Sequence, residues 1–210
     1  MKAIGIQATT LTPFAYHSLM VQSGTATLPE VISDRAIAFG LASTLGMLSN
    51  RVALPEKNYK AHLAAMPYCC SVFITETPAL LPPLTRRLNL GEEGGYDEKI
   101  RRITSKGNLK DFFYTQEVPH DQTFQGVLWG KDGFDPFEVT GQNELVIRIG
   151  LHRNGMVRLR KAPVSQTRLN AWTASLFGQE LPMNRYLLHT IQLTPWMTPD
   201  EAGEKVALWS

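Results

Sequence analysis

The clearest alternation of apolar and polar residues runs through residues 145–161, LVIRIGLHRNGMVRLRK. Near its centre lies Asn154-Gly155, a dipeptide typical of tight hairpin turns. A three-residue loop that ends on a left-handed Gly155 would pair Ile149 with Leu159 and would keep the apolar side chains on one side. The pattern therefore predicts a β-hairpin with one apolar face and one basic face.

The remaining pattern predicts an α+β protein. Strands are predicted at residues 2–9, 68–75, 111–118, 123–129 and 185–193. Helices are predicted at residues 33–48, 57–66 and 165–178, and from residue 198 onward. Ser33 or Asp34 is the expected cap of the first helix, Ser165 caps the third, and Gly178 closes it. This order is that of the ferredoxin-like (RRM-type) plan, an antiparallel sheet with two helices on one face.

The middle of the chain interrupts this plan. Residues 76–108 hold Pro78, Pro82, Pro83 and a Gly-Glu-Glu-Gly-Gly run, which neither a helix nor a strand accommodates well. Long irregular segments within a compact domain are commonly functional or flexible. We therefore expect a single domain, residues 1–210, that carries a projecting insertion at residues 76–125.

Charge adds more through its distribution than through its total. The chain has 210 residues, 43% hydrophobic and 19% charged, with a net charge of only +2, as in an ordinary globular protein. Basic residues cluster between 99 and 110, and no acidic residue occurs from 145 through 170. Such local basic blocks fit a polyanionic partner. No signal peptide or membrane-length apolar run is seen, so a cytoplasmic location without a membrane partner is expected.

The basic hairpin face and nearby aromatic residues predict single-stranded RNA binding. In the predicted register Arg148 lies opposite Arg160, and like charges in that position are unfavourable without an anion between them. The alternative is a solvated edge that protects the sheet from aggregation. Aromatic rings beside phosphate-binding side chains can stack unpaired bases. The predicted RNA-binding residues are Tyr16, His17, Ser18, Arg101, Arg102, Lys106, Lys110, Arg148, His152, Arg153, Arg158, Arg160 and Lys161.

Signs of catalysis, metals or cofactors are few. The nucleotide-binding, metalloprotease and serine-hydrolase motifs are absent, and the histidines lack metal-ligand spacing. Cys69 and Cys70 are adjacent in a predicted strand and would point to opposite faces, so neither a disulfide nor a zinc site is expected. His189, among leucines, is expected to be a core histidine. His17 beside Tyr16 could act as a general acid or base in RNA cleavage, but no further catalytic group is identifiable.

Three segments together resemble a known family. They are the loop and Ala/Gly-rich helix TATLPEVISDRAIAFGLASTLG at residues 25–46, the interrupted centre, and the hairpin IRIGLHRNGMVRLRK at residues 147–161. The arrangement is similar to small RAMP-superfamily subunits of CRISPR surveillance complexes, specifically Cas family five, with the type IV or type I-D style favoured. In that family the insertion is a β-hairpin called the thumb.

The resemblance implies a non-catalytic subunit of an antiviral ribonucleoprotein complex. Its partners would be the 5′ handle of the CRISPR guide RNA, a backbone RAMP subunit whose filament it caps, large or small subunits, and target DNA indirectly. One branch of the family cleaves repeat RNA with a Tyr-Lys-His group, but no lysine in this chain is followed by histidine. Two alternatives stay open, a metal-independent repeat-RNA endoribonuclease on the same fold and a stand-alone single-stranded RNA-binding module.

Overall fold

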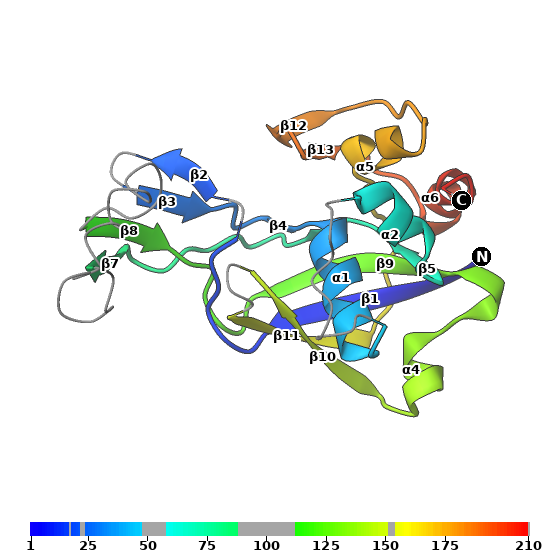
Figure 1. Ribbon diagram of the computed structural model, residues 1–210, viewed down its shortest axis with the longest axis horizontal. Coiled ribbons are helices and arrows are strands. Elements are labelled where there is room, and N and C mark those ends of the chain that lie inside the picture. The colour runs from blue at the N-terminus through cyan, green and yellow to red at the C-terminus, as the bar shows by residue number, and fades with distance from the viewer. Residues whose placement is uncertain (17, 22–23, 48–57, 88–111, 151–153, 210) are drawn as a thin grey trace, which may run out of the picture.

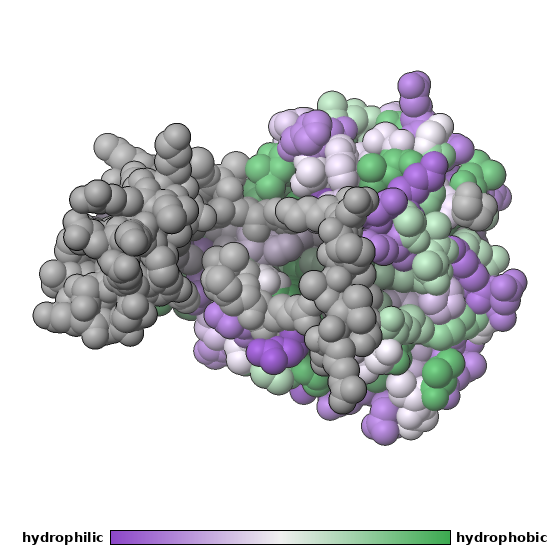
Figure 2. Space-filling model, viewed as in Figure 1, coloured by the Kyte–Doolittle hydropathy of each residue, from purple (hydrophilic) through white to green (hydrophobic). Residues whose placement is uncertain are grey.

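The computed structural model describes residues 1–16, 18–21, 24–47, 58–87, 112–150 and 154–209. Figure 1 shows an elongated molecule, in which a main body built around one large sheet carries a smaller sheet that projects at one end. On the face shown in Figure 2, hydrophilic and hydrophobic side chains are interspersed over the described part of the main body. The fold is a mixed one of helices and a largely antiparallel sheet, as the α+β prediction requires.

The main sheet has seven strands, and every pairing in it is antiparallel. Its order is β10-β11-β1-β9-β6-β4, with β5 also paired to β9. The strands are β1 (Lys2–Thr10), β4 (Val31–Ile32), β5 (Tyr68–Cys70), β6 (Phe73–Ile74), β9 (Thr123–Gly130), β10 (Glu144–Ile149) and β11 (Gly155–Lys161). The predicted strand at 68–75 is thus split in two. At the break, the Ser71 hydroxyl accepts a hydrogen bond from the Val127 N–H at 2.8 Å.

One face of the main sheet carries the larger hydrophobic core. Alternate residues Ile4, Ile6 and Ala8 of β1 are buried there, as the alternation of side chains along a strand requires. Helix α1 (Asp34–Thr44) covers this face, and the Ser33 hydroxyl accepts a hydrogen bond from the Ala36 N–H as its N-cap. The predicted first helix and its cap are therefore confirmed. Helix α2 (Tyr59–Ala64) follows α1 and matches the prediction at 57–66.

The expectation that both main helices lie on one face is wrong. Helices α5 (Ala171–Leu176) and α6 (Pro199–Val206) pack on the opposite face from α1, against Val127 and Trp129 of β9. The physical reason is that residues 127–129 of β9 are all apolar and buried, so both faces of this strand need cover. The indole N–H of Trp129 donates to the Pro199 carbonyl at 3.0 Å, which ties α6 to the sheet.

The C-terminal third differs from its prediction in two places. Helix α5 begins at Ala171 with Asn170, not Ser165, as its N-cap, although Gly178 does end it with φ +73°. The predicted strand at 185–193 is a separate two-stranded hairpin, β12 (Arg185–Leu188) and β13 (Ile191–Leu193). His189 lies in the turn of that hairpin and is exposed, so the core-histidine prediction is wrong. The position beside β1 in the main sheet belongs to β11 instead.

The projecting sheet has four strands in the order β2-β3-β8-β7. They are β2 (Ser18–Val21), β3 (Gly24–Thr27), β7 (Leu84–Arg87) and β8 (Phe112–Gln116). Strands from the predicted insertion therefore join strands from the loop before β4, and β3 runs parallel to β8. Thr123, by contrast, already begins β9 at the centre of the main sheet. Most of residues 76–108 lie outside the described residues, and the assignment of 76–125 as an insertion stays a prediction.

Short elements join β9 to β10. A 3-10 turn, η1 (Lys131–Gly133), is followed by the one-turn helix α4 (Pro136–Thr140), whose N-cap is Asp135. Pro136 at the first helical position and the left-handed Gly141 after the last turn bound α4 on both sides. This connection carries the network of ion pairs that is described below.

Candidate nucleic-acid interface

The β10–β11 hairpin forms with a different register from the predicted one. Ile149 lies opposite Gly155 instead of Leu159, and Arg148 lies opposite Met156 instead of Arg160. The prediction of a three-residue loop with a left-handed Gly155 is therefore wrong. The connection is longer, and the positive φ, +82°, belongs to Gly150.

Each of the two glycines of this hairpin is required for a different physical reason. Gly150 takes the left-handed conformation that non-glycine residues disfavour. Gly155 lies within β11, where a Cβ atom would come within 2.6 Å of the Phe14 Cβ atom. Because the buried Phe14 ring packs closely over the strand, the position leaves no room for a side chain. The Asn154-Gly155 dipeptide thus marks the place where Phe14 packs closely on β11, and not the turn itself.

The separation into an apolar and a basic face is confirmed despite the changed register. The observed partner of Ile149 is Gly155, four positions before the predicted partner Leu159. A shift of the register by an even number of residues leaves each side chain on its face. Ile147 and Val157 are fully buried on the core face. The arginines of the hairpin, Arg148, Arg158 and Arg160, lie on the other face.

The basic face continues as a polar surface across four strands. Residues directly opposite each other in neighbouring strands share a face, so the registers define two rows. One row is Glu144, Arg160, Gln7 and Gln125, and the next is Val146, Arg158, Thr9 and Thr123. All eight of these residues are exposed or half-buried. We call these two rows, with Arg148 and Met156 beside them, the open sheet face.

Other parts of the chain limit the open sheet face on one side. Further along β9, Val127 and Trp129 are covered by α5 and α6. The segment after β11 crosses β1, where the Ala162 N–H donates to the Gly5 carbonyl at 2.9 Å. The open area therefore lies toward β10 and β11, where the three arginines are.

The charges of the open sheet face remain mostly positive. Arg160 forms an exposed ion pair with Glu144, the residue just before the acid-free stretch. The buried Nε of Arg158 has no hydrogen-bond partner within the described part of the chain. Three arginines thus share the surface with one glutamate, and an excess of positive charge attracts an anionic ligand.

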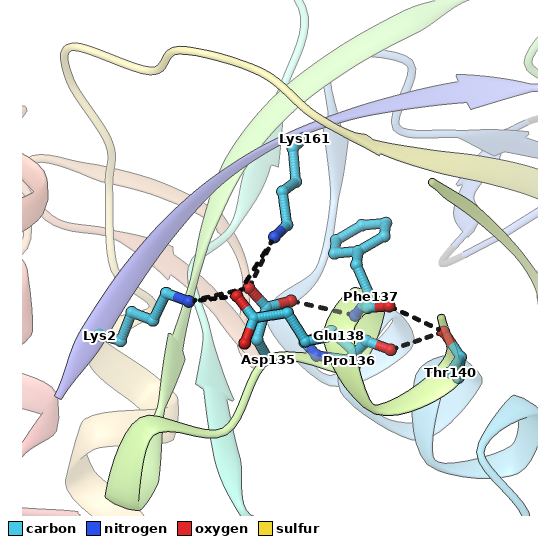
Figure 3. A network of polar contacts seen from close by, with 7 residues as sticks. All are labelled: Lys2, Asp135, Pro136, Phe137, Glu138, Thr140 and Lys161. Carbon is cyan, nitrogen blue, oxygen red and sulfur yellow. Dashed lines mark hydrogen bonds and ion pairs between the residues drawn. The ribbon is translucent and has the colours of Figure 1, made fainter. Parts of the chain in front are cut away.

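Lys161 does not belong to this surface, contrary to the prediction. It follows Arg160 in β11 and therefore points to the opposite face, toward α4 (Figure 3). Its ammonium donates to Asp135 Oδ2 at 2.7 Å, and Lys2 donates to the same oxygen at 3.2 Å. Lys2 also pairs with Glu138 at 2.7 Å. These four residues form what we call the Asp135 cluster.

The Asp135 carboxylate is the buried centre of that cluster. Its side chain is 0% exposed, and its second oxygen accepts a hydrogen bond from the Phe137 N–H at 3.0 Å. Burial by itself would raise the pKa of Asp135, but the hydrogen bonds from Lys161, Lys2 and Phe137 outweigh burial and hold the pKa below its usual range. The carboxylate is therefore ionised and links β1, β11 and α4.

Tyr16, a predicted stacking residue, is partly buried and packs against the larger hydrophobic core. Its hydroxyl donates to the Ser33 hydroxyl at the start of α1, and burial raises the pKa of the phenol above its usual range. Its ring lies 6.4 Å from the ring of Phe14. Ser18 begins β2. The other predicted residues lie outside the described residues, and they are His17, Arg101, Arg102, Lys106, Lys110, His152 and Arg153.

In the part of the chain that the structure describes, no group of three potential metal-ligating side chains occurs. Cys69 and Cys70 are both buried free thiols, and burial raises the pKa of Cys69 to about 11. Among the described residues, no helix is both long and apolar enough to cross a bilayer.

Sequence reasoning missed the neutral half of the open sheet face. Gln7 and Thr9 alternate with buried residues in β1, so the alternation itself could have identified them. Gln125 and Thr123 could not be assigned to the same surface, because the pairing of β9 with β1 joins residues more than a hundred positions apart. Glu144 lies directly before the acid-free stretch, so that stretch gives no sign of it.

Comparisons with known proteins give structural likeness only. No protein-family model matches the chain, and no curated protein is significantly similar in sequence. A chain of a type IV-B CRISPR complex is 10% identical with a TM-score of 0.44, and the match covers 78% of this chain and 91% of that one. Cmr4 (Cas7) of Pyrococcus furiosus is 13% identical with a TM-score of 0.37, over 78% of this chain and 100% of that one.

A third similar structure is a chain of the type III-B Cmr-beta complex bound to cognate target RNA and AMPPnP. It is 12% identical with a TM-score of 0.42, and the match covers 79% of this chain and 67% of that one. These three structures are thus CRISPR proteins. With all three TM-scores below 0.5, the likeness by itself establishes neither a shared family nor a shared function.

Proposed function

We propose that this chain is a non-catalytic, guide-RNA-binding subunit of a cytoplasmic CRISPR RNA-guided complex. The observation that carries the proposal is the open sheet face, where three arginines and a row of neutral hydrogen-bonding side chains cross four strands. Arginines bind phosphates, and uncovered antiparallel sheets are a common platform for single-stranded RNA. The resemblance of residues 25–46 and 147–161 to the RAMP superfamily supports the same function.

The more specific role is that of a Cas family five subunit. In this role the open sheet face binds the sugar-phosphate backbone of the 5′ handle of the CRISPR RNA, and the chain caps the filament of backbone RAMP subunits. The projecting sheet with β7 and β8 takes the place of the thumb (Figure 1). Large or small subunits and, through the guide, the target DNA are the further partners.

The proposal of a non-catalytic role is supported by the surroundings of Tyr16. A phenol that is buried, hydrogen-bonded to Ser33 and raised in pKa is a poor proton donor or acceptor near neutral pH. Of the two residues named for the endoribonuclease alternative, this leaves His17. Incubation of the protein with repeat RNA in EDTA tests it, because a cleavage that His17→Ala abolishes would support the alternative.

Binding of a single-stranded repeat RNA as a function of salt tests the proposed interface. Arg148→Gln/Arg158→Gln should weaken binding, and each lost phosphate contact should reduce the log–log salt slope by roughly 0.7. The matched control is Lys60→Gln/Lys205→Gln, which removes the same charge from helices away from the open sheet face. Equal slopes for the two double variants would contradict the assignment of RNA to this face.

Co-expression tests the assembly. The chain should co-purify with guide RNA and a backbone subunit when its neighbouring genes are expressed with it. Purification of the chain with RNA alone, without other subunits, would favour the stand-alone RNA-binding module.

A further inference from the structure

A second surface with unusual exposed aromatic residues lies around the β12–β13 hairpin. Tyr186 and Trp196 are 57% and 50% exposed, although rings of this size are usually more buried in a monomer. Trp172 of α5 is only partly buried, and its ring lies 6.4 Å from the ring of the exposed His189. The region thus displays several rings to solvent within a short stretch of chain.

An arginine holds one of these rings in place. The Arg168 guanidinium lies over the Trp196 ring at 5.3 Å from its centre. Its Nε donates to the Thr194 carbonyl at 2.5 Å and its Nη2 to Asn184 Oδ1 at 2.6 Å. Because Arg168 is only 6% exposed and is fixed by these bonds, it supports one side of the Trp196 ring.

The same contacts connect Trp196 with the start of β12, where Tyr186 lies. Asn184, which Arg168 binds, comes directly before β12, and its N–H donates to the Leu193 carbonyl of β13 at 2.9 Å. Tyr186 is the second residue of β12 and lies opposite Gln192. The surface formed by Tyr186, Asn184, Arg168 and Trp196 is called the aromatic hairpin surface below.

Charge indicates what kind of ligand this surface takes. Within the described residues Arg168 has no carboxylate partner, and both of its fixed acceptors are neutral oxygens. Burial lowers the pKa of Arg168, and the nearby Arg185 lowers it further, which means that its positive charge is poorly compensated. Arg185 itself pairs with Glu30 at 2.9 Å. A ligand that combines flat rings with negative charge matches this surface best.

We infer that the aromatic hairpin surface binds single-stranded nucleic acid by stacking unpaired bases on Tyr186 and Trp196. Base–aromatic stacking is tolerant of sequence, because every base has a π face, and arginine beside the ring adds to it. A protein partner could also use exposed Trp and Tyr, but the uncompensated cation behind the ring favours a polyanion.

This site is separate from the open sheet face and goes beyond the proposed function. The hairpin packs through Ile191 and Leu193 against Val31 and Val72, at the β4 and β6 edge of the main sheet. The arginines of the open sheet face are at the opposite edge, on β10 and β11. Figure 1 shows the two hairpins on opposite sides of the main body. The open sheet face contacts the sugar-phosphate backbone of the nucleic acid, whereas the aromatic hairpin surface contacts its bases.

Two labelled RNA oligonucleotides of the same length test the inference. One is oligo(A) of about 10 nucleotides, within the usual span of a single-stranded site, and the other is an abasic strand with the same phosphates. Trp196→Ala and Tyr186→Ala should each weaken oligo(A) binding about 5- to 100-fold, the usual range for a lost base stack. Neither should change binding of the abasic strand. Trp196→Phe should restore most of the oligo(A) affinity because it keeps a ring.

Matched variants make the outcomes distinct. Leu208→Ala removes another exposed apolar side chain, on the segment after α6, and should change neither affinity. Arg148→Gln/Arg158→Gln should weaken both strands equally, so its failure would contradict the proposed function alone. Equal losses on both strands for Trp196→Ala would overturn base stacking. No change on either strand for both aromatic variants would also overturn it and would indicate a protein-facing surface.

Discussion

Arg160 and Lys161 are neighbours in β11 with the same charge, yet they lie in two different environments. Arg160 is on the open sheet face, where it forms an ion pair with the exposed Glu144. Lys161 points to the other face, where it pairs with a fully buried carboxylate, Asp135. The comparison shows that alternation along a strand divides a run of basic residues between two faces, so neighbours of the same charge have different partners.

The largest expected effect is the loss of the Asp135 carboxylate. Asp135→Asn leaves Lys2 and Lys161 without their shared anion, whereas asparagine can still cap α4. Because the lysine side chains are 44% and 46% exposed, the cost is that of the lost charge-assisted hydrogen bonds, about 1.5–3 kcal/mol. Chemical denaturation should show a loss of this size at neutral pH. A free energy of unfolding equal to that of the wild type would mean that the Asp135 cluster does not stabilise the fold.

The pH dependence of stability tests the same cluster by a second route. The pKa of Asp135 is lowered in the folded protein, so its contribution is present above the unfolded value of about 3.9. As the pH falls from about 4 through the lowered folded value, the contribution is lost. The melting temperature of the wild type should therefore fall more steeply in this range than that of Asp135→Asn. If the melting temperatures of the two proteins fell in parallel with pH, the lowered pKa of Asp135 would be contradicted.

Gly155 tests the register on which the comparison depends. Gly155→Val places a branched side chain against Phe14, where even a Cβ atom would lie at 2.6 Å. Overpacking of this kind costs about 1–3 kcal/mol. Gly141→Asn is the control, because asparagine tolerates the left-handed conformation there and a Cβ atom at that position would meet nothing within 4 Å. If the control lowered the melting temperature more than Gly155→Val does, Gly155 would not be the residue on which Phe14 packs closely.

Replacing Lys161 or Arg160 by methionine tests the difference between the two faces directly. Lys161→Met should lower the free energy of unfolding by about 1 kcal/mol, because it removes a charged hydrogen bond to Asp135. Arg160→Met should change stability by less than about 0.5 kcal/mol, since exposed ion pairs contribute little. The order should reverse for RNA, with a weaker salt slope for Arg160→Met only. Equal RNA binding by both variants would remove the distinction between the two faces.

The smallest expected effect is a gain. Glu144→Gln removes the acidic partner of Arg160 and frees its guanidinium. RNA affinity should rise at low salt, and the magnitude of the salt slope should increase by at most roughly 0.7, one phosphate contact. Thr140→Ala in α4 serves as an uncharged control. A decrease in affinity would mean that Glu144 positions Arg160 for binding.

Local features of the chain were predicted well because neighbouring residues determine them. The first strand, the helix capped by Ser33, the helix start at Thr198 and the helix end at Gly178 each depend on a few adjacent residues. The apolar and basic faces of the hairpin were also predictable, since alternation holds in any register that differs by an even number. The register itself was not, because the closest turn signal, Asn154-Gly155, was overruled by the packing of Phe14 on Gly155.

The sequence by itself therefore determined the elements, their faces and the presence of a basic hairpin. Only the tertiary structure decided which charges remain available. Lys2 meets Asp135 across 133 positions of the chain, and β9 completes the open sheet face beside β1. The same is true of Arg168, whose partners Asn184 and Thr194 come from a separate hairpin. Such contacts join residues far apart in the chain, and no local pattern of hydrophobicity or charge specifies them.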